Sequence, residues 1–193
     1  CNPETMVRDL KMFEEKYDFF ASIFEYLIKD YNSDSGGKYA EYYTPHAVAR
    51  IMSAILVNEK TKNVTRYDPS AGSGTLLMNL AHKIGEENCT IYSEDISQKS
   101  SNMLRLNLIL NNLTPSIPNI IKTNTILNPL YLDKKFDYVI VDVAGRNSRE
   151  MITSLSVSHL LIAPHQASQL DLDTIQELNA QITRIKDLNP NLT

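Results

Sequence analysis

The sequence contains little cysteine and glycine, and it has no long apolar run. Two cysteines, Cys1 and Cys89, are too few for a disulfide framework, and neither their spacing nor that of the four histidines fits a metal site. No apolar run reaches the roughly 18 residues that a membrane-spanning helix needs. The opening residues, CNPETMVRDLKMF, do not begin with methionine and carry no basic-then-apolar signal region. These absences predict a cytoplasmic protein without a metal site or a membrane span, and a sequence that is a fragment of a longer chain.

An excess of positive charge is also missing. The 193 residues include 19 Lys and Arg against 23 Asp and Glu, which gives a net charge of −4 and a pI near 5.6. A domain that binds DNA unaided usually has a basic footprint, because neutralising phosphates dominates such affinity. If nucleic acid is the substrate, we expect another subunit to supply much of the grip. The length is that of one domain, or of one domain with an appendage.

Two helices are predicted before the first strand. The first has apolar residues at spacings of three and four, and it stops at NSDSGG, so residues 1–36 are predicted to be an N-terminal helical segment. The second is HAVARIMSAIL, with Thr44 as its cap and Pro45 in its first turn. The apolar stripe of the first helix consists of Leu10, Phe13, Tyr17, Phe20, Phe24, Leu27 and Tyr31.

Strands and helices then alternate, which is the pattern of a doubly wound α/β fold. The later strands have the continuous apolar character of a buried parallel sheet. We assign residues 37–165 to this main domain. The predicted strands are 63–67, 89–93, 119–122 and 136–141, and the predicted helices are 75–84 and 100–112.

The C-terminal segment, 166–193, is predicted to be one more helix. Its apolar residues repeat near heptad spacing, an Asp173–Gln176 pair resembles a capping box, and the pattern closes before Pro190. Such a stripe serves either the core of the protein or pairing with a partner helix, and the sequence leaves both open. The stripe consists of Leu172, Ile175, Leu178, Ile182, Ile185 and Leu188.

The most informative stretch is YDPSAGSG, directly after the first strand. Ligands of doubly wound sheets lie outside the carboxyl ends of the strands. Gly72 and Gly74 would let the backbone approach a ligand closely, and the following helix would offer free N–H groups. The stretch is neither GxGxxG nor a P-loop, because no Lys follows the second glycine. Asp68 would repel a pyrophosphate, but it suits a ligand with a positive charge, such as a methionine moiety.

A second acidic position follows the next strand, where YSEDIS contains Glu94 and Asp95. Nucleotide-binding folds keep an acid at this place for ribose hydroxyls. One acid after each of the first two strands fits S-adenosylmethionine better than a dinucleotide. The alternative is an ordinary turn after the first strand and solvated charge after the second.

Four segments, in this order, resemble the modification (methyltransferase) subunit of type I restriction–modification systems. They are AEYYTPHAVARIM, DPSAGSGTLLMNLAHKI, IYSEDISQKSSNMLRLNLILNN and FDYVIV, and the resemblance covers residues 17–141. Members of that family are adenine-N6 DNA methyltransferases. The resemblance implies a class I S-adenosylmethionine-dependent methyltransferase fold.

The resemblance also implies a role for each matching residue. Segment 41–45 would pack on the cofactor, and the loop after the first strand would surround its amino-acid part. Asp95, rather than Glu94, falls on the ribose-binding acid, and Asn124 falls where relatives often carry an Asp near the adenine ring. Tyr42 and Tyr43 could equally be core residues. The implied cofactor residues are Glu41, Tyr42, Tyr43, Thr44, Pro45, Asp68, Ser70, Ala71, Gly72, Gly74, Asp95 and Asn124.

After the fourth strand the sequence departs from the family. Relatives read Asn-Pro-Pro-aromatic there, whereas this chain has Asp142 followed by Val143, Ala144 and Gly145. Asp is known in the first place, and Asp142 would orient the amino group of the target adenine, but the prolines and the base-stacking ring are absent. Either the chain is a degenerate relative, or the residues from Asp142 onward do not continue the natural chain. The simpler interpretation of Asp142 is a structural or merely exposed acid.

The sequence therefore predicts transfer of a methyl group from S-adenosylmethionine to adenine N6 in DNA, by direct in-line displacement. The family implies a complex with a specificity subunit, and a nuclease subunit could accompany it. One alternative is a cofactor-binding scaffold subunit without turnover. Another, a small-molecule methyltransferase, is weakened by the YYTP segment before the sheet.

Overall fold

The structure is a computed structural model that describes residues 23, 26, 44–57, 63–143, 149–164 and 169–193, with only the backbone for 169–174. The predicted N-terminal stripe, the NSDSGG break and three predicted cofactor residues (Glu41, Tyr42 and Tyr43) lie outside the described residues. The chain divides into two compact units, Cys1–Ile140 and Val141–Thr193, which are described separately.

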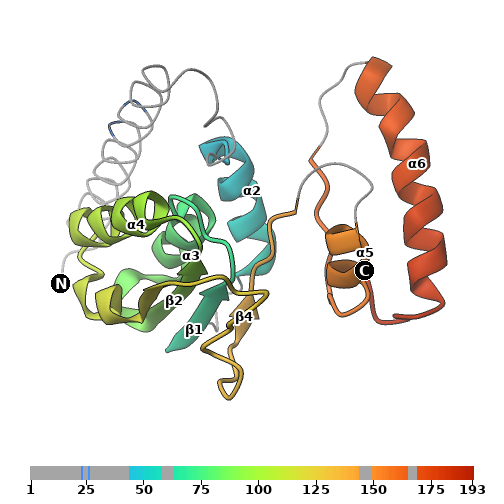
Figure 1. Cartoon of the computed structure of the whole chain (residues 1–193). Coiled ribbons are helices and arrows are strands. Elements are labelled where there is room, and N and C mark those ends of the chain that lie inside the picture. Colours follow the sequence, from blue (N-terminus) through green and yellow to red (C-terminus); the bar gives the residue numbers. More distant parts are fainter. Residues whose placement is uncertain (1–22, 24–25, 27–43, 58–62, 144–148, 165–168) are drawn as a thin grey trace. The chain divides into compact units, whose positions relative to one another are not determined.

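The first unit contains a four-stranded parallel sheet with the order β3-β2-β1-β4 (Figure 1). Asp68 pairs with Ser93, and Asp95 pairs with Lys122, so the carboxyl ends of the three strands that carry them meet at one edge. Parallel pairing and the strand order confirm the predicted α/β class. The strands are β1 (Val64–Asp68), β2 (Cys89–Asp95), β3 (Ile120–Lys122) and β4 (Tyr138–Val139).

The strand predicted over 136–141 is much shorter in the structure. β4 pairs with β1 through only two residues, although the Asp137 and Ile140 N–H groups also donate to the carbonyls of Thr65 and Tyr67. Among the strands that the structure describes, β4 is the last in the order and is paired on one side only. The apolar run FDYVIV overestimated the strand because hydrophobicity alone does not report the extent of pairing.

Three helices lie before, between and after the first strands: α2 (His46–Leu56), α3 (Thr75–Ile84) and α4 (Gln98–Leu110). α3 matches its prediction. α4 begins two residues early because the Ser97 hydroxyl caps it, accepting from the Ser100 N–H at 3.2 Å. The Thr44 cap was wrong: Pro45, with extended backbone, is the N-cap of α2, and its carbonyl accepts from the N–H groups of Val48 and Ala49. Two short 3-10 helices, Glu86–Asn88 and Thr114–Asn119, precede β2 and β3.

The core lies between the sheet and α3 and α4, with α2 packed on α3. Fully buried apolar side chains from each layer, such as Leu77, Ile91 and Leu104, meet there. The buried core residues are Ala49, Leu76, Leu77, Met78, Leu80, Ala81, Ile91, Leu104, Leu108, Leu113, Ile120 and Ile140.

The opposite face of the sheet carries aromatic rings. Tyr67 of β1 and Tyr92 of β2 are paired in register, and strand alternation places both on the face away from Ile91. Phe136 stacks on Tyr67 with ring centroids 4.8 Å apart, and Tyr131 meets both tyrosines edge-on. The connection from β3 to β4, residues 123–137, therefore folds back over this face of the sheet.

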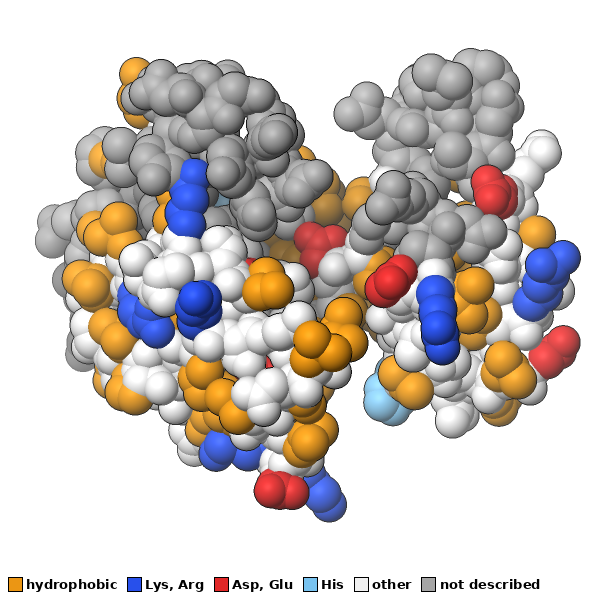
Figure 2. Space-filling model, in the orientation of Figure 1, with side chains coloured by type: hydrophobic (Ala, Val, Ile, Leu, Met, Phe, Trp, Pro, Cys, Tyr) orange, Lys and Arg blue, Asp and Glu red, His pale blue; other side chains and the backbone are white. Residues whose placement is uncertain are grey.

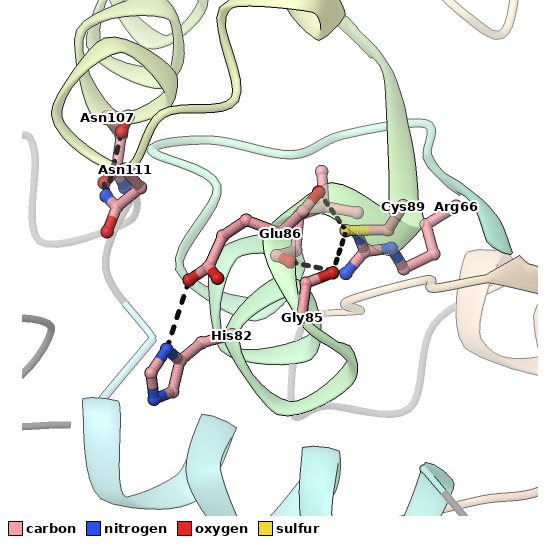
Figure 3. Close-up of polar contacts among 8 residues, drawn as sticks. Arg66, His82, Gly85, Glu86, Cys89, Asn107 and Asn111 are labelled. Carbon is pink, nitrogen blue, oxygen red and sulfur yellow. Dashed lines mark hydrogen bonds and ion pairs between the residues drawn. The ribbon is translucent and has the colours of Figure 1, made fainter. Parts of the chain in front are cut away.

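A cluster of polar side chains and carbonyls lies at the amino end of β2 (Figure 3). The thiol of Cys89 donates to the carbonyls of Gly85 and Glu86, and the neighbouring Arg66 guanidinium donates through Nη1 to the Leu77 carbonyl at 3.2 Å. Arg66 is fully buried, and within the described part of the chain its Nε and Nη2 have no hydrogen-bond partner. Burial lowers the pKa of Arg66 and raises that of the Cys89 thiol. None of the predicted site residues lies in this cluster.

Gly74 is expected to be essential for packing the first unit. It has φ +81, and a Cβ there would lie 2.2 Å from Cδ1 of Leu104, a side chain with no exposed surface. Gly74→Ala should lower the free energy of unfolding by about 2–4 kcal/mol, because backbone strain and overpacking add. The control is the Leu104→Ala background, which removes the side chain that the new Cβ would meet, so Gly74→Ala should cost less there than in the wild type. Denaturant unfolding that gives equal losses in both backgrounds would contradict this account.

Asp137 is expected to contribute a small, pH-dependent stabilisation. Its Oδ2 accepts from both the N–H and the hydroxyl of Thr65, at 2.8 and 2.7 Å, and these bonds lower the pKa of Asp137. A depressed carboxyl pKa stabilises the fold above about pH 4, and the effect is lost as the pH falls through the folded value. Asp137→Ala should therefore melt at most a few degrees lower at neutral pH, because the group is exposed, and the difference from wild type should narrow as the pH falls below about 4. Thermal melts of both proteins across this range test it, and a pH-independent difference would count against it.

The second unit contains α5 (Arg149–Leu155) and α6 (Gln169–Lys186). The predicted capping pair was wrong: α6 begins at Gln169, so Asp173 and Gln176 lie inside it. Ile185 is buried, whereas Leu188 lies beyond the helix and is 74% exposed, so the predicted stripe does not continue to its last member. None of the helices that the structure describes is long and apolar enough to cross a membrane. The core of this unit consists of Met151, Leu155, Ile185 and Leu192.

Candidate cofactor site

Asp68 ends β1 and shapes the loop that follows. The residue is only 2% exposed, and its Oδ1 accepts from the Ser70 N–H at 2.8 Å, which is an Asx turn. The loop then turns back through Gly72, at φ +55, and the Gly74 N–H donates to the Ala71 carbonyl at 2.8 Å. The predicted residues Asp68, Ser70, Ala71, Gly72 and Gly74 thus form one compact turn at the start of α3.

Asp95 connects the end of β2 to this turn. Its Oδ2 accepts from the Gly72 N–H at 2.9 Å, and its Oδ1 accepts from the Ser97 N–H at 2.7 Å. The side chain is 6% exposed, and each oxygen keeps a further lone pair. The structure therefore brings together the two acids that the sequence singled out, with the glycine turn between them.

Glu94 points to the other side of the sheet, as strand alternation requires. It is fully buried, and its oxygens accept from the Tyr67 hydroxyl and the Leu130 N–H, both at 2.6 Å. Burial and the bond to Glu94 raise the pKa of Tyr67 well above its usual range, and burial with the nearby charge of Glu94 raises that of Tyr131 to about 12. From the sequence, Asp95 rather than Glu94 was predicted to bind the ribose, and Glu94 had no predicted role. The period of two along β2, which separates it from Asp95, was the signal that it serves the opposite face.

Asn124 follows β3 at the same edge. It is partly buried, and its Oδ1 accepts from the N–H groups of Ile126 and Leu127, at 3.1 and 3.2 Å. The hydroxyl of the next residue, Thr125, donates to the Pro69 carbonyl at 2.7 Å. The loop after β3 is thus bound to the loop after β1, through a residue that the sequence analysis missed.

The segment before the sheet is described from Thr44 onward. Thr44 is partly buried and Pro45 is exposed. In the first turn of α2, His46 Nδ1 lies 3.2 Å from Asn79 Nδ2, and Asn79 also donates to the Thr75 carbonyl at 2.8 Å. The start of α2 therefore lies against the first turns of α3, the helix that directly follows the glycine turn.

Asp142, the predicted catalytic residue, is exposed and lies in the range of the second unit. Val143 packs against the core of that unit, and Ala144 and Gly145 lie outside the described residues. Asp142 and the edge formed by Asp68 and Asp95 belong to different units. Its role stays a prediction.

The arrangement can hold a ligand that is cationic at one end and hydroxylated at the other. Asp68 places a carboxyl group in the turn between β1 and α3, which disfavours phosphate there, and Asp95 offers lone pairs beside the Gly72 backbone. Among the described residues, no group of three or more His, Cys, Asp or Glu side chains could hold a metal ion. The carboxylates and backbone N–H groups at this edge offer hydrogen bonding and charge pairing.

A known protein family and several known proteins are similar to this chain. The profile of the N-6 DNA methylase family matches residues 15–144. The chain is 27% identical over 150 residues to the type I restriction enzyme MpnII methylase subunit of Mycoplasma pneumoniae, covering 76% of this chain and 27% of that protein. It is 19% identical over 130 residues to the HindI methylase subunit of Haemophilus influenzae, covering 65% of this chain and 28% of that protein.

A solved structure is also similar to this chain. It is the type I restriction–modification methyltransferase subunit from Streptococcus thermophilus, with 31% identity and a TM-score of 0.50 over 61% of this chain and 26% of that one. The chain spans little more than a quarter of the length of the curated relatives. Its parallel sheet is that of the class I methyltransferase fold, as predicted. By its sequence match across residues 15–144, the chain belongs to the N-6 DNA methylase family.

Proposed function

We propose that this chain binds S-adenosylmethionine at the edge formed by Asp68, Gly72 and Asp95, and that it serves transfer of the methyl group to N6 of adenine in DNA. The observation that carries the proposal is the contact between the Asp95 carboxylate and the Gly72 N–H. It joins an acid at the end of β2 to a glycine turn at the end of β1. Two relatives support methyl transfer to DNA as the reaction, because they are named as a type I methylase subunit and a type I methyltransferase subunit.

Each residue has a distinct part in holding the cofactor. Asp68 would pair with the positive charge of the methionine moiety, and the glycine turn would admit that moiety without a side chain in the way. Asp95 would accept from ribose hydroxyls, and Asn124 would contact the adenine ring. When bound, S-adenosylmethionine supplies an electrophilic methyl group on a sulfonium. The predicted cofactor residues before the sheet, Glu41 to Pro45, would cover the same ligand.

On the DNA side, Asp142 would accept a hydrogen bond from the adenine amino group and orient its nitrogen toward the methyl group. The stacking ring that adenine-N6 enzymes place three residues later is Gly145 here, so this chain must obtain base stacking from another residue. We propose that a specificity subunit, and in some assemblies a nuclease subunit, accompany this chain on DNA. The net charge of −4 supports this, and the Lys and Arg side chains visible on the first unit are spread out rather than gathered in one patch (Figure 2).

A second candidate function is a cofactor-binding subunit without turnover. The replacement of Pro-Pro-aromatic by Val143-Ala144-Gly145 favours it, because no proline fixes the backbone carbonyl that should meet the adenine. This candidate shares the cofactor site and differs only in the reaction.

Two measurements test these proposals in order. Calorimetric titration of S-adenosylmethionine into the protein should show saturable binding, and no binding would overturn both candidates. Transfer of a tritiated methyl group to DNA, measured with the specificity subunit present, then separates them. Incorporation that depends on Asp142 supports the methyltransferase, whereas tight binding without incorporation supports the scaffold.

A further inference from the structure

We propose that Glu94 is a positioning residue that fixes the β3–β4 connection, residues 123–137, against the sheet and thereby holds the adenine side of the cofactor site. This inference rests on the proposed function for its effect on the cofactor. The anchoring itself is a property of the fold and can be measured separately.

The side chain of Glu94 is unusual for a carboxylate. It has no exposed surface, and both oxygens accept short bonds of 2.6 Å, one from the Tyr67 hydroxyl of β1 and one from the Leu130 N–H of the connection. No Lys or Arg among the described residues forms an ion pair with it. Burying a carboxylate without a basic partner is costly unless strong hydrogen bonds satisfy it. The Tyr67 hydroxyl and the Leu130 N–H therefore stabilise the buried carboxylate of Glu94, and Leu130 belongs to the β3–β4 connection.

Other hydrogen bonds also hold the connection: the Thr123 N–H donates to the Asp95 carbonyl, the Tyr131 hydroxyl donates to the Asn119 carbonyl, and Asp137 bonds to Thr65. Thr125 bonds to the Pro69 carbonyl near its start, and Tyr131 and Phe136 pack on Tyr67 and Tyr92 further along. The bond from Leu130 to Glu94 lies between these contacts. Several apolar side chains of the connection face solvent instead of a core, namely Ile126, Leu127, Leu130 and Leu132. Burial of these side chains therefore adds little to the anchoring, and backbone and hydroxyl hydrogen bonds matter more.

The last two residues of β2 thus hold two different loops. Asp95 accepts from Gly72 in the loop after β1, and Glu94 accepts from Leu130 in the loop after β3. Because neighbouring strand residues point to opposite faces, two consecutive acids can serve both loops. Loss of the Glu94 acceptor should loosen the side that contains Asn124 and leave the Asp95 contact in place.

Three variants test the inference. Glu94→Ala removes the acceptor from Leu130, Glu94→Gln keeps an acceptor of the same shape, and Tyr67→Phe removes the other bond but leaves Leu130 paired. The readouts are hydrogen exchange of the Leu130 amide, measured by NMR, and affinity for S-adenosylmethionine. Glu94→Ala should speed Leu130 exchange about tenfold or more and weaken the affinity about tenfold, since the Leu130 N–H loses its charged acceptor. Glu94→Gln should retain most of the Leu130 protection and most of the affinity for S-adenosylmethionine. Tyr67→Phe should keep the Leu130 amide protected.

Three results would overturn the inference: unchanged Leu130 exchange in Glu94→Ala, unchanged affinity despite faster exchange, or equal losses in the Ala and Gln variants. If Glu94→Ala does not fold, faster Leu130 exchange in Tyr67→Phe than in Glu94→Gln would also overturn it, and the reverse order would support it. Wild-type protein that binds no S-adenosylmethionine would instead sink the proposed function. Leu130 exchange would then still report on the anchoring alone.

Discussion

Asp95→Ala is expected to weaken binding of S-adenosylmethionine by about 100-fold or more. The substitution removes the proposed acceptor for the ribose hydroxyls, and it leaves the Gly72 and Ser97 N–H groups without their present acceptor. A hydrogen bond to a charged group contributes about 1.5–3 kcal/mol, so the loss of two bonds to the ribose hydroxyls corresponds to at least about 100-fold in affinity. Calorimetric titration of the variant beside wild type measures the change directly.

The control for Asp95 is an acid at the opposite edge of the sheet. Glu87 is exposed and lies before β2, whereas Asp95 ends that strand. Glu87→Ala should therefore bind the cofactor as the wild type does. If Asp95→Ala also bound it with unchanged affinity, the carboxylate would be only a structural anchor for the glycine turn, and ribose recognition would have to come from another residue.

The predicted bounds of the central elements agree with the structure because the positions of Gly and Pro and the hydrophobic pattern mark the same boundaries there. Gly74 and Gly85 delimit α3, and β1 ends where Pro69 begins the turn. The predicted bounds of β4 and α6 were less accurate, and the reason is physical. The end of β4 depends on pairing with β1, and the start of α6 depends on residues before the apparent capping pair, so neither is encoded by local pattern alone.

The candidate site was predictable to the extent that it follows from strand ends. Parallel strands place their carboxyl ends at one edge, so Asp68 and Asp95 were expected to be neighbours from topology alone. The contacts of Glu94 with Leu130 and of Thr125 with Pro69 join residues 36 and 56 positions apart. They depend on the path of an irregular connection, for which the sequence has no periodic signal.

Asp68→Asn is expected to distinguish charge from loop shape at the end of β1. The amide oxygen can still accept from the Ser70 N–H, so the Asx turn should persist and the melting temperature should change little. Loss of the charge should weaken S-adenosylmethionine binding about 10- to 100-fold, because one charge-assisted contact to the methionine moiety is removed. Affinity for 5′-methylthioadenosine, which lacks the amino-acid part, should remain that of the wild type. Competition titrations with both ligands measure the difference. An equal loss for both would mean that Asp68 acts through the loop, and no loss for either would remove it from the cofactor site.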